Sequence, residues 1–150
     1  MKILIATILI SFGLTTYGQI TKGDDGKFYQ KNALYNGIHT EYYDDGTVKG
    51  TYNIVNGEYS GDVKLFFPDG SLKEVRAYKN GIKNGKWETF NSKGVKTGEA
   101  NYISNKKHGK WFIWDDQGTL RCEMLYDNGA KKGLWTIYNE KGKVEKTQEF

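Results

Sequence analysis

The chain of 150 residues contains one cysteine, one proline and two histidines. Because Cys122 has no second cysteine to pair with, an internal disulfide framework is excluded, although small exported domains often depend on one. The two histidines, His39 and His108, give too few ligands for a typical zinc site. They also leave few candidates for the base that activates a catalytic nucleophile. We therefore expect no metal site, no cofactor and no enzymatic activity.

Long helical patterns and a strong charge are also missing. No stretch has apolar residues at the helical period over enough length to predict a helix. Lys and Arg number 22 against 18 Asp and Glu, and the net charge of +4 does not demand a nucleic acid partner. Aromatic residues make up 15% of the chain while the mean hydropathy is −0.70. This combination favours a thin, half-exposed β-sheet over a thick globular core.

A positive start and an apolar run at residues 3–14 open the chain. The run is shorter than the roughly 20 residues that a membrane-spanning helix needs. Small residues follow, and Thr16 and Gly18 are suitably placed for cleavage before Gln19. This pattern predicts a secretory signal peptide at residues 1–18, with an uncleaved anchor as the alternative. We expect an exported protein in the periplasm, at the cell surface or outside the cell.

Glycine is abundant, with 19 residues, and ten of the glycines recur at a fixed interval of 24 residues. One series begins the repeat units and the other marks a turn inside each unit. Self-similarity at a constant period is the signature of a repeat protein, so we assign these glycines a structural role. The first series is Gly37, Gly61, Gly85, Gly109 and Gly133, and the second is Gly46, Gly70, Gly94, Gly118 and Gly142.

Each unit has the residues of a β-hairpin. The segment after the first glycine is aromatic and β-branched, which predicts a strand. A turn such as Pro68-Asp69-Gly70 follows, then a return strand, and an Asn-Gly pair at residues 80–81 opens a longer turn to the next unit. The fold class predicted is all-β: an open antiparallel meander of consecutive β-hairpins in an elongated single sheet.

The repeat defines the domain organisation. Units starting at residues 37, 61, 85, 109 and 133 form a repeat domain at residues 37–150. Residues 19–36 are an N-terminal lead-in with a partial capping repeat, because terminal units of an array are commonly atypical.

Aromatic residues recur in columns, which we expect to form ladders of cross-strand neighbours. They supply the core of the repeat fold, and one exposed face would offer them to a ligand. The columns are His39, Val63, Trp87, Trp111 and Trp135; Tyr42, Phe66, Phe90, Trp114 and Tyr138; and Ile54, Tyr78, Tyr102 and Tyr126.

Charge differs between the two long edges of the predicted sheet. Acidic turns such as Asp44-Asp45 and Asp115-Asp116 lie along one edge, where turn formation explains them better than calcium binding does. Lysines gather at the opposite edge, and we name them the basic rim. The rim would attract anionic lipid, anionic glycan or an acidic protein, or would simply block aggregation of the sheet. Its members are Lys79, Lys83, Lys86, Lys106, Lys107, Lys110, Lys131 and Lys132.

The pattern G-x-W-x-x-[FYW]-x-x-x-G-x-[LV], with Y-x-N-G-x-x-x-G between units, resembles the MORN repeat. It is similar to the variant found in YwqK-family antitoxin-like proteins. Trp87, Trp111 and Trp135 carry the resemblance most clearly, and it covers about residues 26–150. The first two units depart, with His39 and Val63 in the tryptophan column. The resemblance implies an elongated sheet of hairpins without catalytic residues, with binding or scaffolding roles toward proteins or membrane lipids.

We interpret the chain as an exported, non-enzymatic repeat protein that mediates protein–protein interaction in the cell envelope. One alternative is association with membrane lipid or an anionic surface polymer through the lysine-rich edge. Another, suggested by the resemblance, is antitoxin-like neutralisation of a toxin partner. The residues predicted to contact a partner are Trp87, Trp111, Trp114, Trp135, Tyr138, Lys106, Lys107, Lys131 and Lys132.

Overall fold

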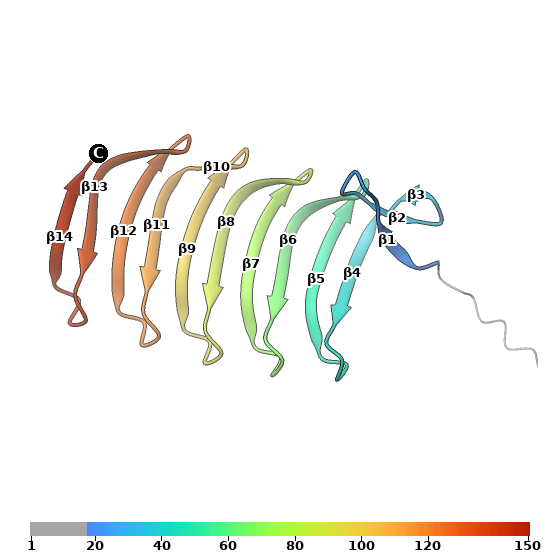
Figure 1. Ribbon diagram of the computed structural model, residues 1–150, viewed down its shortest axis with the longest axis horizontal. Helices are drawn as coiled ribbons and strands as arrows, with labels where there is room; N and C mark the ends of the chain where they lie inside the picture. The colour runs from blue at the N-terminus through green and yellow to red at the C-terminus, as the bar shows by residue number, and fades with distance from the viewer. Residues whose placement is uncertain (1–17) are drawn as a thin grey trace, which may run out of the picture.

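The computed structural model describes residues 18–150 (Figure 1), so the predicted signal peptide lies outside the described residues except for Gly18. Strands dominate, and the described residues contain no helix. The strands are β1 (Ile20–Lys22), β2 (Phe28–Gln30), β3 (Ala33–Leu34), β4 (Gly37–Tyr42), β5 (Val48–Val55), β6 (Glu58–Phe66), β7 (Leu72–Lys79), β8 (Ile82–Phe90), β9 (Lys96–Ile103), β10 (Lys106–Lys107), β11 (Gly109–Trp114), β12 (Leu120–Asp127), β13 (Ala130–Tyr138) and β14 (Val144–Glu149).

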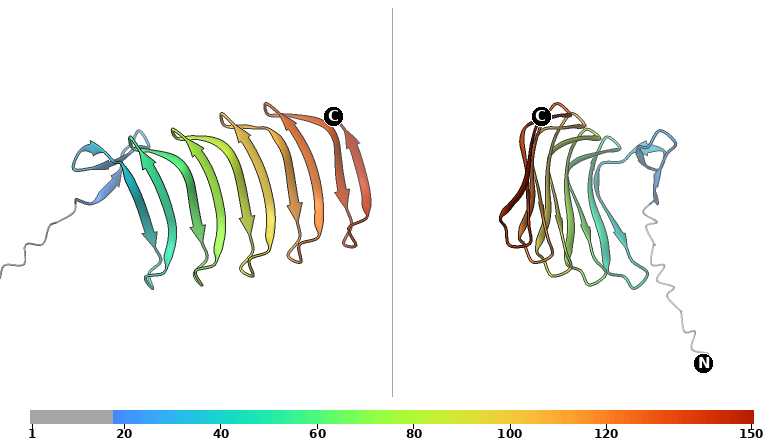
Figure 2. Two further views of the ribbon diagram at one scale, coloured as in Figure 1. Left: turned by 180° about the vertical axis from the view of Figure 1, so that it is seen from behind. Right: turned by 60° about the vertical axis from the view of Figure 1, so that its left-hand side comes forward.

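The predicted meander is confirmed. Eleven strands form one antiparallel sheet in which β4 to β9 and β11 to β14 follow one another in chain order, while short β10 pairs with β9. The lead-in differs from the repeat units, because β1, β2 and β3 form a separate three-stranded sheet beside the β4 end (Figures 1 and 2). In residues 18–150 no helix has the length and apolar character needed to cross a bilayer.

Glycines of the second series close the turns at what we call the lower edge, as oriented in Figure 1. In the first unit the N–H of Gly46 donates to the carbonyl of Tyr43 at 2.9 Å, and Gly118 donates in the same way to Asp115 at 2.9 Å. Both glycines have φ of 84°, in the left-handed region that disfavours other residues. The strand register shifts at each of these turns, so the pairing resumes after one extra residue.

The turns at the upper edge are tighter than the sequence suggested. Asn56 and Gly57 alone join β5 to β6, with φ of 51° and 75°, so β6 begins three residues before Gly61. Two consecutive positive φ values match the twist of a hairpin, which is why Asn-Gly pairs suit this turn. Ser104 and Asn105 form the same turn without glycine, with φ of 48° and 67°.

Three glycines of the first series, Gly61, Gly85 and Gly133, lie inside strands and let them bend, while Gly37 and Gly109 begin β4 and β11. Gly85 in β8 has φ of 113°, and Gly133 in β13 has φ of 60°. The strands arc over at the upper edge (Figures 1 and 2), which folds the hairpin tips toward one face of the sheet. The sequence prediction that these glycines open a strand is thus confirmed at Gly37 and Gly109, whereas the other three lie at a bend inside a longer strand.

Hydrogen bonds between successive upper turns join the units. Each turn donates a backbone N–H to a carbonyl that lies just after the preceding upper turn. Such nearest-neighbour bonds make the stability of one unit depend on the next, as in other repeat arrays. The bonds are Gly57 to Tyr35 at 2.9 Å, Gly81 to Tyr59 at 2.8 Å, Asn105 to Lys83 at 3.0 Å and Gly129 to Lys107 at 2.7 Å.

A carboxylate in one lower turn couples stability to pH. Asp69 accepts bonds from the hydroxyl of Ser71 at 2.6 Å and its N–H at 2.9 Å, and these bonds hold the pKa of Asp69 below its ordinary value. A depressed folded-state pKa stabilises the fold above the unfolded pKa, and this contribution is lost as the pH falls through the folded pKa. We therefore expect the acid-induced loss of unfolding free energy below about pH 4 to be shallower in Asp69→Asn. Urea unfolding across this range measures it, and equal acid dependence in both proteins would contradict the assignment.

Candidate functional site

Rings from two predicted columns form one continuous aromatic stack. Residues at the same position of successive units stand two strands apart, or about 9.6 Å, so their rings cannot touch. Rings of the intervening strands fill the gaps, which the separate columns did not predict. Neighbouring centroids lie between 4.6 and 5.8 Å apart. The stack consists of Phe28, His39, Tyr52, Tyr59, Tyr78, Trp87, Tyr102, Trp111, Tyr126, Trp135 and Phe150.

The stack continues through the unit whose columns lack rings. Ile54 and Val63 occupy the ring positions there and are the most deeply buried apolar side chains described, at 0% and 2% exposure. Tyr52 and Tyr59 replace the missing rings, with centroids 5.7 Å apart. The rings of Tyr52 and Tyr59 thus compensate for the missing rings at Ile54 and Val63, and the aromatic stack stays continuous.

The tryptophans of the stack use their polar edges internally. The indole N–H of Trp87 donates to the carbonyl of Ala77 at 3.1 Å. Trp111 donates to Asn101 at 3.0 Å in the next unit. Because a half-buried indole N–H needs a partner, these bonds fix the ring against the preceding strand. The geometry gives Trp87 and Trp111 a structural role, and their contact with a partner stays a prediction.

Lysines of the basic rim lie over the stack. The Nζ atom of Lys107 is 4.5 Å from the Trp111 ring centroid and 4.8 Å from that of Tyr126. Lys131 stands 4.6 Å from Trp135 and 4.4 Å from Phe150. Each such contact is worth about 0.5–1 kcal/mol at an exposed site. These lysines therefore cap the aromatic rings, in addition to any contact with a partner.

Ion pairs neutralise other members of the basic rim. The ammonium of Lys132 lies 3.2 Å from Asp127, that of Lys110 lies 2.9 Å from Glu123, and that of Lys86 lies 3.2 Å from Glu99. Lys79 and Lys106 have no carboxylate within 4.0 Å among residues 18–150. The rim is consequently less positive than its lysine count suggests.

The remaining predicted contacts lie on the other face of the sheet. Trp111 and Phe112 are consecutive strand residues, so their side chains point to opposite faces. Trp114 packs with Phe112 at a centroid distance of 5.5 Å, which places it away from the stack. Its column alternates across strands with aliphatic residues, such as Leu120 opposite Trp114 and Val144 opposite Tyr138. The structure thus brings Trp87, Trp111, Trp135, Lys107 and Lys131 together and places Trp114 and Tyr138 elsewhere.

An apolar hollow that the sequence did not predict lies on the stack face near the C-terminal end. It has a volume of about 170 Å³, and Ile113 and Ile137 beside it are 48% and 43% exposed. Both isoleucines stand two residues after a stack tryptophan, and this period-two spacing along a strand was the available signal. The hollow is lined by Cys122, Met124, Trp135, Ile137, Lys146, Thr147 and Gln148.

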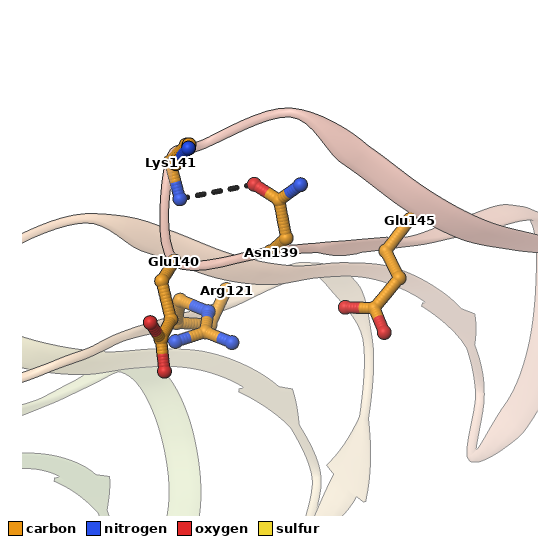
Figure 3. Close-up of a pocket in the computed structure, with 5 residues that line it drawn as sticks. All are labelled: Arg121, Asn139, Glu140, Lys141 and Glu145. Carbon is orange, nitrogen blue, oxygen red and sulfur yellow. Dashed lines mark hydrogen bonds between the residues drawn. The ribbon is translucent and has the colours of Figure 1, made fainter.

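A larger concavity of about 600 Å³ lies beside the lower turn that joins β13 to β14 (Figure 3). Its walls are polar and charged, with Arg121, Glu140, Lys141 and Glu145 around Asn139. The Arg121 Nε donates to the carbonyl of Tyr138 at 3.0 Å, and the Lys141 N–H donates to Asn139 at 2.9 Å. These bonds shape the turn at this concavity.

Candidate reactive groups are dispersed. His39 stands 3.8 Å from Glu41, and His108 stands 3.5 Å from Asp127. Burial raises the pKa of the Cys122 thiol, which disfavours the thiolate, and no histidine lines the hollow beside it. The part of the chain that the structure describes has no group of three His, Cys, Asp or Glu side chains that would hold a metal ion.

Three segments of the chain, residues 35–56, 59–80 and 107–128, match the family model of the MORN repeat variant. The chain is similar to the MORN repeat variant. MORN repeats are generally associated with binding and interaction and are typically non-enzymatic. Each matched segment contains one hairpin of the large sheet: β4 with β5, β6 with β7, and β11 with β12. No curated protein matches the chain.

Proposed function

We propose that this chain is an exported, non-enzymatic binding protein that engages a protein partner in the cell envelope. The observation that carries the proposal is the apolar surface around the hollow on the stack face. The similarity of the chain to MORN repeats, which are generally associated with binding and interaction, supports the same class of function.

The surface has the make-up of a protein interface. Exposed Ile113 and Ile137 flank the hollow, and Trp135 supplies a ring anchored by its N–H on Leu125 at 3.0 Å. An apolar centre with a fixed aromatic side chain and a polar border is typical of the patches where proteins bind one another. Lys146 and Gln148 provide that border. Of the predicted contacts, Trp135 is therefore the one we place directly in the binding surface.

The interaction is tested with an envelope extract from the native cell. We expect immobilised protein to retain a discrete partner at low and at high salt, because an apolar interface persists when charges are screened. Ile137→Ser should reduce the retained amount at least about tenfold, the equivalent of 1.4 kcal/mol. Ile38→Ser is the matched control, since Ile38 is 69% exposed at the other end of the sheet. Equal retention by both variants would refute this surface, and a toxin among the retained proteins would identify the antitoxin-like alternative.

A second candidate function rests on the upper edge. Exposed Ile82 and Ile103 lie on β8 and β9, close to the unpaired lysines Lys79 and Lys106. Aliphatic side chains beside free cations suit the boundary of an anionic membrane or surface polymer. The exposed isoleucines beside these lysines favour the upper edge over the lower edge as the surface that associates with a membrane or a surface polymer.

Sedimentation with phosphatidylserine vesicles tests the second candidate. We expect binding at low salt that is lost at high salt. The Lys79→Glu, Lys106→Glu double variant should bind about thirtyfold more weakly, since each lysine contributes about 1 kcal/mol. Lys141→Glu at the lower edge should bind as the unmodified protein does. If vesicle binding changed neither with salt nor with the double substitution, the upper edge would be excluded as the membrane-binding surface.

A further inference from the structure

The two end strands of the large sheet, β4 and β14, carry opposite charges at matching positions of the repeat. Inside the sheet, residues at these positions face each other across neighbouring strands. Lys146 on β14 stands one repeat after Cys122, and Glu41 on β4 stands one repeat before Leu65. The interior pairs are Gly50 with Leu65, Glu74 with Thr89, Gly98 with Ile113 and Cys122 with Ile137.

Each of the two end residues carries a charge of a sign that no other residue at the equivalent repeat positions carries. Glu41 is the one acidic residue among the five equivalent first-strand positions, and Lys146 is the one basic residue among the five second-strand positions. The remaining residues there are mostly glycine or aliphatic. Glu41 is the only charged residue of its series, and the other charge in the second-strand series, Glu74, faces Thr89 inside the sheet. The opposite signs at the two terminal positions therefore point to a pairing between the two ends.

Among residues 18–150, the one basic group near Glu41 is the imidazole of His39 at 3.8 Å, and neither Glu41 nor Lys146 pairs with a permanently charged side chain. The Glu41 carboxylate, 43% exposed, accepts a bond from the hydroxyl of Tyr52 at 2.9 Å and has no lysine or arginine within 4.0 Å. Lys146 is exposed and has no carboxylate within 4.0 Å. The strands that carry them lie at opposite ends of the sheet (Figure 1), so the two side chains cannot meet within one chain.

We propose that a second copy of this chain docks head to tail, with β14 of one copy pairing antiparallel with β4 of the next. In the register of the interior pairs, Lys146 faces Glu41. Thr147 faces Thr40, as Glu123 faces Thr136 inside the sheet. The edge strands then satisfy each other's outward N–H and C=O groups, and the opposite charges select this register over others.

The lead-in limits the extent of this contact. The Tyr35 hydroxyl donates to the carbonyl of Ile38 at 2.9 Å, and the Phe28 ring stands 5.8 Å from His39, so the first half of β4 is covered. The end of β4 near Tyr42 lies away from the small sheet (Figure 1). The contact is therefore short and weak, and because it joins unlike ends it continues from copy to copy without closing.

Sedimentation velocity of the purified protein over a concentration series tests the proposal. We expect the sedimentation coefficient to rise with concentration at low salt. Lys146→Glu and Glu41→Lys should each weaken association about tenfold, because an attraction becomes a repulsion of similar size. The double variant should associate again, and so should an equimolar mixture of the two single variants. Glu145→Lys, at the bulged residue next to Lys146 that has no partner in the register of β13 and β14, should behave as the unmodified protein does.

The mixing experiment distinguishes a lost charge pair from a folding defect, because a misfolded single variant would not associate again when the two variants are mixed. Recovery in both the double variant and the mixture establishes the pairing of Glu41 with Lys146 between copies. A protein that stays monomeric over the whole series overturns the proposal, as does unchanged association of the single variants. Because Lys146 also borders the apolar hollow, envelope-partner retention is measured on Glu41→Lys, which lies at the opposite end of the sheet. Loss of self-association with full partner retention in this variant separates the pairing of copies from the proposed binding function.

Discussion

Trp111→Ala is expected to lower the free energy of unfolding by about 3 kcal/mol. Trp111 lies in the middle of the aromatic stack, with ring centroids of Tyr102 and Tyr126 both at 5.2 Å. Removing it ends ring contacts on two sides, uncovers Lys107, and leaves the carbonyl of Asn101 without the indole donor. Chemical denaturation followed by fluorescence or circular dichroism measures the loss.

Two controls separate the sources of this effect. Trp111→Phe keeps a ring in the stack but loses the N–H donor, so we expect a cost of about 1 kcal/mol. Trp114→Ala removes an equally large side chain on the other face, where the one ring contact is with Phe112. Its cost should be about half that of Trp111→Ala. If Trp114→Ala were the more damaging of the two, the stack would not be the main source of stability.

Gly85→Ala is expected to be nearly as damaging, with a loss of about 3 kcal/mol. Gly85 has φ of 113°, and an added Cβ would stand 2.8 Å from the Cβ of Ala77. Strain in the backbone and a clash within the sheet therefore act together at the bend of β8. The melting temperature and the urea midpoint of the variant measure the combined cost.

Gly94→Ala supplies the matched control in the same hairpin. Gly94 has φ of 78°, but an added Cβ there meets nothing within 4 Å. It should cost about 1–2 kcal/mol, the penalty of the left-handed conformation alone. Equal losses in the two variants would show that the bend tolerates a side chain and that conformation alone sets both costs.

Local chemistry explains why the sequence predicted the hairpins. Positions that need positive φ select glycine or asparagine, so Gly70 and Asn80-Gly81 mark the turns without reference to the rest of the molecule. Repetition at a fixed interval then places each hairpin next to its neighbour. The partial cap in the lead-in was also signalled by a turn, because the N–H of Gly26 donates to Gly23 at 2.9 Å as in the repeat units.

Relations between units were harder to predict, because they depend on distances across the sheet. The column of Trp87 and the column of Tyr78 merge into one stack since a single column leaves gaps too wide for contact. The capping of the Trp111 ring by Lys107 was not predicted either, because the sequence placed the lysines at an edge and did not show that they lie over the rings. The apolar hollow combines residues of β12, β13 and β14, including Gln148 outside the repeat motif.

The strands run across the long axis of the molecule, and residues 18 and 150 lie toward its opposite ends (Figure 1). A pull applied between these ends loads the hydrogen bonds of one strand pair at a time, as in the opening of a zipper, instead of shearing many pairs together. Each unit of 24 residues, once released, lengthens the chain by up to about 80 Å. Anchored at both ends, the array would yield stepwise at low force and serve as an extensible tether.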